Sequence, residues 1–352
     1  PTLSQFIIVM LMFCGACTGS TGGGLKVGRI MILIKTVIRE LRRAINPRRV
    51  KCIKLDGAVI DKEIISTTSD KYDDFNSLLK GHLKLSTKIV QSLRHTEGSV
   101  TANDRVVRMI DNVYKDETVV IRIPEKSTPP LLCEMDLDII YEDEDILVLN
   151  KPAGISAHPT RRHPNGTLAN GVANYIIKNG GGEAAGRAIG RLDKGTSGVI
   201  VFAKNSLSAF RLNGKIEKTY FALVKGDISD SGTIDTPIYR PDPNKTLRAV
   251  STTREDALPA VTHWQLEKRN GNRALLKVNI ETGRTHQIRV HFSSIGFALI
   301  GDDMYGGEVT ENLSRPGLHC GKAEFIHPTT NEPMSFEAEL PGDMLNELKI
   351  KN

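Results

Sequence analysis

The feature that most constrains this chain is an uninterrupted apolar run, Val-Ile-Val-Phe-Ala at residues 199–203, that follows a polar turn at residues 190–198. Such a run is typical of a strand that is buried on both faces. The turn holds glycines and short hydroxyl side chains, which allow a tight bend, and one carboxylate, Asp193. Arg191 lies two residues before it and favours its ionised form. The sequence therefore predicts a carboxylate held at the end of a rigid sheet.

The full string around this carboxylate resembles a known motif. Taken alone, an aspartate in an Asp-Lys-Gly turn is most often a solvated turn residue. Here the string is Arg-Leu-Asp-Lys-Gly-Thr-Ser-Gly at residues 191–198, with Ala-Lys-Asn at residues 203–205 after the strand. It resembles the aspartate motif of the RluA family of RNA pseudouridine synthases, which implies that Asp193 is the catalytic carboxylate. Gly190 replaces the histidine usual there, and glycine is typical of the sister family acting on small-subunit ribosomal RNA.

A second motif is Glu-Lys-Thr-Tyr at residues 217–220, which begins a strand-like segment. A tyrosine that alternates with apolar residues is usually part of a core. In the family that the chain resembles, the tyrosine of the Lys-x-Tyr motif stacks against the target base. The resemblance therefore gives Tyr220 that role, since a flat aromatic face suits any base.

A third motif is His-Gln-Ile-Arg at residues 286–289, which lies at the start of a predicted helix. We expect Thr285 to cap this helix and Gly296 to end it. Arg289 lies near the amino end of this helix, and such an end attracts anions. The alternative is that Arg289 is a helix arginine that faces solvent. In the family this arginine pairs with the catalytic aspartate, which makes Arg289 the expected partner of Asp193.

The resemblance also implies a set of RNA contacts. Lys151, in Asn-Lys-Pro-Ala-Gly at residues 150–154, either meets a phosphate or flanks a turn on the surface. Residues 142–145 are all acidic and lie between two apolar runs, which predicts a hairpin. The further expected contacts in the catalytic part are Arg191, Thr196, Lys218, Arg284 and His286.

A smaller unit is expected over residues 73–124, between a polar linker at residues 64–73 and a proline-rich linker at residues 124–131. Asp73 or Asp74 is a candidate cap for one short helix and Ser86 for a second. Two short helices and a few strands resemble the alpha-L RNA-binding domain. The cations that this unit would present to phosphate, or carry only as surface residues, are Lys84, Lys88 and Arg94.

The first part of the chain has a different character. Residues 26–54 carry ten basic side chains and one acidic side chain, a net charge of +9, and residues 1–25 carry no charged side chain. Because the whole chain has a net charge of +6, the part from Leu55 onward has a net charge of −3. Bulk charge therefore does not show that the larger part binds RNA. The apolar run at residues 6–13 is too short to span a bilayer. The glycine-rich stretch at residues 18–24 fits no phosphate-binding loop.

Residues 1–65 resemble the last pore loop and following helix of TrkH-type potassium transporters. One such loop cannot form a filter, which needs several loops around one axis. We expect a gene fusion or a misread reading frame; a basic amphipathic helix that contacts a membrane through residues 1–50 is the alternative.

The cysteines and histidines point to no cofactor. The five cysteines are scattered, which favours a reducing, cytoplasmic compartment over a disulfide framework. A lone Cys-x-x-Cys at residues 14–17 lacks the second pair that zinc needs, and the nine histidines show no ligand spacing. The sequence predicts no metal and no cofactor.

These observations together predict an α+β fold. It consists of a mixed, largely antiparallel sheet with peripheral helices, and residues 134–350 form the catalytic domain. The expected activity is isomerisation of uridine to pseudouridine in structured RNA, ribosomal or transfer RNA, by a monomer. The alternatives are an RNA-binding protein of the same fold without catalysis and a fragment of a potassium-transport subunit.

Overall fold

The computed structural model describes residues 53–55, 58–124, 130–160, 163–179 and 186–349. The chain divides into two compact units, Pro1–Lys51 and Cys52–Asn352. The predictions for the pore-loop-like segment, the basic run and the Cys-x-x-Cys pair lie outside the described residues. Within the described ranges, no helix combines the length and the apolar character needed to cross a bilayer.

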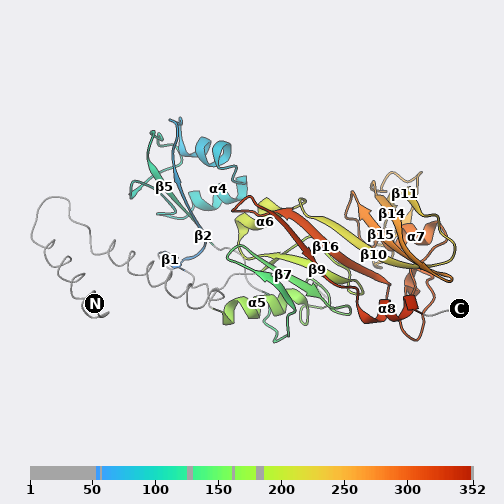
Figure 1. Ribbon diagram of the computed structural model, residues 1–352. Coiled ribbons are helices and arrows are strands. Elements are labelled where there is room, and N and C mark those ends of the chain that lie inside the picture. Colours follow the sequence, from blue (N-terminus) through green and yellow to red (C-terminus); the bar gives the residue numbers. More distant parts are fainter. Residues whose placement is uncertain (1–52, 56–57, 125–129, 161–162, 180–185, 350–352) are drawn as a thin grey trace, which may run out of the picture. The chain divides into compact units, whose positions relative to one another are not determined.

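The larger part of the second unit is built on a ten-stranded sheet (Figure 1). Its main strand order is β11-β14-β15-β10-β16-β9-β7-β6, with β17 paired to β16 and β8 paired to β9. Among its described strand pairs, β9 and β16 form the one parallel pair. The mixed, largely antiparallel sheet of the expected α+β fold is therefore confirmed. The strands are β6 (Ile139–Glu142), β7 (Ile146–Lys151), β8 (Arg187–Ile189), β9 (Ser197–Ala203), β10 (Glu217–Lys225), β11 (Ser231–Asp235), β14 (Val261–Asn270), β15 (Arg273–Ile280), β16 (Leu318–Ile326) and β17 (Pro333–Glu337).

The central strand β9 is the apolar run that the sequence singled out. Every residue from Ser197 to Ala203 is buried, because β9 is paired on both sides and covered on both faces. The predicted hairpin with an acidic turn is also present, since β6 pairs with β7 and Asp143 accepts backbone hydrogen bonds from Asp145 and Ile146. The core therefore fixes the position of the turn that precedes β9.

Helices and a short hairpin complete this part of the unit. Buried Leu168, Val172 and Ile176 of α5 pack into the core around β7 and β9, and α8 packs Met344 and Leu348 into a smaller cluster that includes Leu275 of β15. Figure 1 shows α7 beside β14 and β15. The remaining elements are α5 (Leu168–Lys178), α6 (Ser206–Leu212), β12 (Ile238–Tyr239), β13 (Ala249–Val250), α7 (Gln287–Ser294), the 3-10 helix η2 (Asp303–Tyr305) and α8 (Gly342–Lys349).

The smaller part of the unit has a five-stranded sheet and short helices. Asp74 accepts a hydrogen bond from Ser77 N at 2.6 Å, and Ser86 accepts one from Ile89 N at 3.2 Å, so the caps predicted at Asp74 and Ser86 are confirmed. The sheet order is β1-β2-β5-β3-β4. Its elements are β1 (Ile53–Leu55), β2 (Ala58–Thr67), α3 (Phe75–Ser77), the π-helix η1 (Leu78–His82), α4 (Thr87–Arg94), β3 (Val100–Ala102), β4 (Arg105–Val106) and β5 (Thr118–Pro124).

The prediction of a polar linker over residues 64–73 is wrong for the first residues of this range. Ile64 pairs with Ile121 and Thr67 pairs with Thr118, so β2 continues through this stretch as a strand beside β5. Ile64 and Ile65 are adjacent among polar residues, so the sequence shows no alternation that would predict this strand. The sheet of the smaller part therefore begins before residue 73 and includes residues of the segment that resembles a transporter.

Candidate active site

The turn that carries Asp193 connects β8 to β9 and is held by hydrogen bonds to its own carbonyls. Thr196 N donates to Asp193 O at 3.1 Å, and Gly154 N donates to Lys194 O at 2.8 Å. Arg315 Nη1 donates to Gly195 O at 3.2 Å. Each of these contacts fixes a backbone group next to the carboxylate. Asp193 is therefore presented from a rigid turn, as the sequence predicted.

Gly198, at the start of β9, explains why this turn requires a glycine. Its φ is +110°, and a Cβ there would collide with the carbonyl oxygen of Cys320 on β16. The backbones of β9 and β16 approach closely at this point, which only glycine permits. The close approach brings the Asp193 turn against β16.

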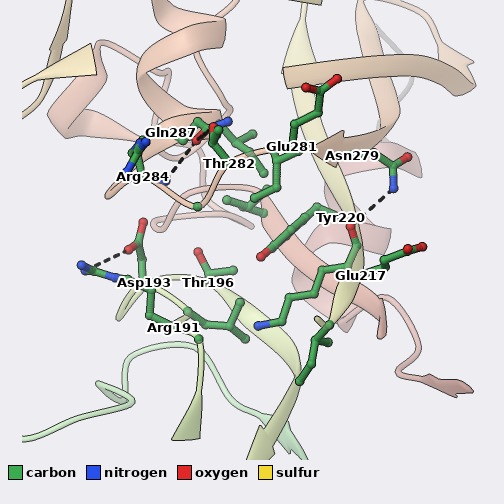
Figure 2. Close-up of a pocket in the computed structure, with 18 of the residues that line it drawn as sticks. Arg191, Asp193, Thr196, Glu217, Tyr220, Asn279, Glu281, Thr282, Arg284 and Gln287 are labelled. Carbon is green, nitrogen blue, oxygen red and sulfur yellow. Dashed lines mark hydrogen bonds and ion pairs between the residues drawn. The ribbon is translucent and has the colours of Figure 1, made fainter. Parts of the chain in front are cut away.

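Three cationic or imidazole groups surround the Asp193 carboxylate. Arg191 Nη2 lies 3.6 Å from Oδ1, Arg289 Nη1 lies 3.8 Å from Oδ2, and His286 Nε2 lies 3.9 Å from Oδ2. The Asp193 side chain keeps 14% of its surface exposed, so it is reachable from the cavity. Figure 2 shows Arg191 facing this carboxylate. The expected pairing of Asp193 with Arg289 is therefore present as a contact.

Arg289 is itself held by a second carboxylate that the sequence analysis did not single out. Its Nε and Nη2 donate to Asp302 Oδ2 and Oδ1, both at 2.7 Å, and Asp302 is fully buried. Burial alone would lower the pKa of Arg289, but its hydrogen bonds to the Asp302 carboxylate and the charge of that group outweigh burial and raise the pKa. Because this fork uses one edge of the guanidinium, Nη1 is the nitrogen left to face Asp193. The signal for Asp302 was present as Gly-Asp-x-x-Tyr-Gly at residues 301–306.

Tyr305, from the same motif, supports both Arg289 and His286. The guanidinium carbon of Arg289 lies 5.0 Å from the centre of the Tyr305 ring. The Tyr305 hydroxyl lies 2.9 Å from His286 Nδ1, and it accepts a hydrogen bond from Arg248 N at 2.9 Å. Asp302 and Tyr305 thus position the groups around Asp193 from behind.

His286, rather than the expected Thr285, is the N-cap residue of α7. Its φ of +58° places it in the left-handed region, a strained conformation for a residue with a side chain. The Thr285 hydroxyl instead accepts a hydrogen bond from Arg191 Nη1 at 2.8 Å. Burial lowers the pKa of His286 to about 4, and the nearby arginines oppose its protonation further. The imidazole is therefore neutral at neutral pH.

The expected site residues of the catalytic part converge on one cavity of about 820 Å³. Tyr220 of β10 forms part of its wall, and Figure 2 shows its side chain projecting into this space. Burial raises the pKa of Tyr220 well above 10, which keeps it a neutral phenol. The cavity is lined by eight of the predicted residues: Arg191, Asp193, Thr196, Lys218, Tyr220, Arg284, His286 and Arg289.

Lys151 does not lie where it could meet a phosphate. Its side chain is fully buried, and its ammonium donates to the carbonyls of Pro152 and Ile155 at 2.8 Å and of Lys194 at 3.4 Å. Burial lowers its pKa to about 8. The prediction of a phosphate contact is corrected here, because these carbonyls already bind the ammonium and tie β7 to the Asp193 turn.

The three cations expected in the smaller part are not among the described residues that line this cavity. Lys84, Lys88 and Arg94 are exposed, with Lys88 and Arg94 on α4 and Lys84 just before it. In the ranges that the structure describes, no group of three or more His, Cys, Asp or Glu side chains is arranged to hold a metal ion.

Comparisons with known proteins identify the family of this chain. A family model described as RNA pseudouridylate synthase matches residues 145–294, and one described as cation transport protein matches residues 1–68. The RNA pseudouridine synthase YlyB of Bacillus subtilis (strain 168) is 40% identical over 70% of this chain and 84% of its own length. The ribosomal large subunit pseudouridine synthase D of Pseudomonas aeruginosa is 34% identical over 71% of this chain and 82% of its own.

A solved structure of the human RNA pseudouridylate synthase domain containing 1 aligns with a TM-score of 0.49 and 24% identity, covering 64% of this chain and 89% of that one. The family assignment rests on the sequence relatives, most of whose length this chain covers. The chain belongs to the RNA pseudouridine synthase family.

Proposed function

We propose that this enzyme converts uridine to pseudouridine in structured ribosomal RNA, with Asp193 as the catalytic carboxylate. The observation that carries the proposal is the convergence of the three motifs on one cavity, where Asp193 faces Arg289 and Tyr220 forms a wall. Relatives named for the large ribosomal subunit support ribosomal RNA as the substrate class. A uridine in a stacked helix has to be flipped out before it can enter such a cavity.

The chemistry requires one carboxylate. The bond between N1 of the base and C1′ of the sugar breaks, the base turns, and a bond from C5 to C1′ forms. The proton on C5 is lost and N1 gains a proton, so atoms balance without an oxidant or reductant. Asp193 acts at the sugar, either by attacking C1′ or by taking the adjacent sugar proton.

The other residues of the cavity bind and orient. Arg289, fixed by Asp302, holds the Asp193 carboxylate turned toward the sugar. Tyr220 offers its ring to the base and excludes water from it. The exposed guanidinium groups of Arg191 and Arg284 lie at the rim, where phosphates would pass. Thr196, Lys218 and His286 line the cavity beside them as further substrate contacts.

The smaller part, from β2 to β5, is proposed to be an alpha-L-type RNA-binding domain. Its short helices are capped as that resemblance implies, and its exposed cations would neutralise phosphates. The match of residues 1–68 to a cation transport protein supports a fusion of a transporter end to a synthase that acts in the cytoplasm.

The test is pseudouridine formation by the wild type and by the Asp193→Asn variant. We expect the wild type to form pseudouridine in a transcript of bacterial large-subunit ribosomal RNA, and the variant to bind that RNA equally well without forming any. Binding without product in the wild type would favour the non-catalytic RNA-binding protein. Potassium flux through vesicles containing the chain would favour the transport fragment.

A further inference from the structure

Lys218, on β10, carries a positive charge in the cavity without a partner among the described side chains. The residue lies two positions before Tyr220, so both side chains project from the same face of β10 and both line the cavity. It is largely buried, and no hydrogen bond or ion pair of its ammonium is present in the described part of the chain. By contrast, the two arginines that contact Asp193 have defined acceptors, since Arg191 donates to Thr285 and Arg289 donates to Asp302.

The surroundings of this ammonium are unfavourable to a charge. Burial lowers the pKa of Lys218, and the titratable group that acts on it, the thiol of Cys320 on β16, has its own pKa raised to about 11 by burial. A neutral thiol does not balance a cation. A buried charge without a partner costs folding free energy, so this lysine is expensive to keep unless a ligand uses it.

Gly190 leaves the approach to this ammonium open. Its φ is +73°, and a Cβ on Gly190 would point at Lys218 Nζ from 3.6 Å. Because residue 190 is glycine, no side chain at this position covers the nitrogen. A ligand in the cavity can therefore reach it.

We propose that the Lys218 ammonium donates a hydrogen bond to a ring carbonyl oxygen of the flipped uracil, so that it is a substrate-contacting residue for the base. The proposal rests on the proposed function. A base that stacks against Tyr220 presents its edge along β10, where Lys218 lies. A uracil carbonyl accepts hydrogen bonds and satisfies the ammonium.

A base edge fits this position better than a phosphate. The cavity already has exposed cations at its rim, Arg191 and Arg284, where the RNA backbone would lie in water. Lys218 lies deeper, beside an aromatic ring and a neutral thiol, where a phosphate dianion or monoanion would lose its hydration. Base readout rather than backbone neutralisation is the use that suits a buried donor.

The test uses Lys218→Met and Lys218→Arg, with Lys277→Met as the matched control on the exposed side of β15. The substrate is a large-subunit ribosomal RNA transcript that carries tritium at uridine C5, because C5 loses its proton in the reaction. Release of tritium gives kcat and KM, filter retention gives the RNA dissociation constant at several salt concentrations, and thermal unfolding gives Tm.

We expect Lys218→Met to lower kcat/KM about 100-fold, to leave the RNA dissociation constant and its salt dependence unchanged, and to raise Tm. Lys218→Arg recovers part of the activity, and Lys277→Met changes none of these quantities. Transcripts with 2-thiouridine and with 4-thiouridine distinguish the two carbonyls, since sulfur is the weaker acceptor. The wild type slows on one of them, whereas Lys218→Met is insensitive to both.

Each other outcome overturns the proposal. A salt dependence that falls by about one phosphate contact in Lys218→Met assigns the residue to the RNA backbone. A lower Tm with unchanged kcat/KM assigns it to the fold alone. If the wild type itself releases no tritium, the proposed function fails and this proposal fails with it; release that is equal in the wild type and Lys218→Met overturns this proposal only.

Discussion

The cavity and the smaller part of the unit use positive charge in opposite ways. In the cavity, Arg289 is buried, donates two hydrogen bonds to Asp302 and contacts Asp193. In the smaller part, Lys84 and Lys88 are exposed on a short helical region. A charge in a buried site acts strongly and depends on its geometry, whereas an exposed charge is screened by water and salt. We therefore expect one region to orient a reacting group and the other to contribute affinity for RNA.

We expect the largest effect on stability and activity from the loss of Asp302, because this residue belongs to the buried ion pair of the cavity. Asp302→Asn leaves the Arg289 guanidinium buried without its carboxylate, and breaking such a pair costs about 3–5 kcal/mol of unfolding free energy. We expect that loss in chemical denaturation, with a fall in kcat of about 100-fold because Arg289 no longer holds its direction.

A double variant separates positioning from stability. Arg289→Met with Asp302→Leu removes both charges, so we expect most of the stability to return. Activity stays low, because the Asp193 carboxylate then lacks its buried guanidinium and keeps only the exposed Arg191 as a cationic neighbour. A double variant with wild-type kcat would show that the pair only stabilises the fold.

Lys151 is a buried lysine whose hydrogen bonds are made to protein carbonyls, so it can be compared directly with the exposed lysines. Lys151→Met removes hydrogen bonds to three carbonyls, one of them in the Asp193 turn. We expect kcat to fall about 10-fold and the unfolding free energy to fall by about 1–3 kcal/mol. The salt dependence of RNA binding should not change. If the slope of log affinity against log salt concentration is smaller in this variant, the phosphate contact predicted from the sequence would be correct after all.

His286 gives the cavity a pH signature that the exposed cations lack. Its pKa is lowered to about 4 in the folded protein, whereas the unfolded chain takes up the proton near the ordinary value of about 6.5. The stability that the neutral ring provides is therefore complete above pH 6.5 and is lost as the pH falls toward 4.

His286→Asn tolerates the left-handed backbone and removes this titration. Unfolding free energies measured at pH 7.5, 5.5 and 4.5 should fall less steeply with decreasing pH in the variant than in the wild type. Equal slopes would show that His286 titrates normally. We expect kcat to fall only a few-fold, since Arg191 and Arg289 remain beside Asp193.

The smallest effect on rate is expected from the exposed cations. A variant with Lys84, Lys88 and Arg94 all replaced by alanine should reduce the slope of log affinity against log salt concentration by about 2–3. Its kcat at saturating RNA should equal that of the wild type. A lower kcat with an unchanged slope would mean that these residues serve the fold of the smaller part, and would remove the contrast between the two regions.

The sequence predicted the sheet well where one signal was dominant. The apolar run of β9 follows a turn-rich stretch and is typical of a strand covered on both faces, and the structure has it so. The short segment before residue 68 carried a weaker signal, and the pairing of β2 with β5 appears only once the partner strand is placed. A strand made of mixed residues depends on its neighbours, which are distant in the sequence.

The site shows the same division. The motif residues around Asp193 were predicted because each motif is local. Asp302 was missed as the partner of Arg289, because a fork between a helix and a turn 13 positions later follows from packing. Lys151 was misjudged for the same reason, since only the fold shows that its ammonium is enclosed by carbonyls.

A structure of the Asp193→Asn variant bound to its RNA substrate tests the central claim most directly. The account predicts a uridine flipped into the cavity, its base against Tyr220 and its C1′ or the adjacent sugar carbon within about 3.5 Å of the side chain of residue 193. A target uridine bound outside this cavity, with its sugar far from residue 193, would contradict the account.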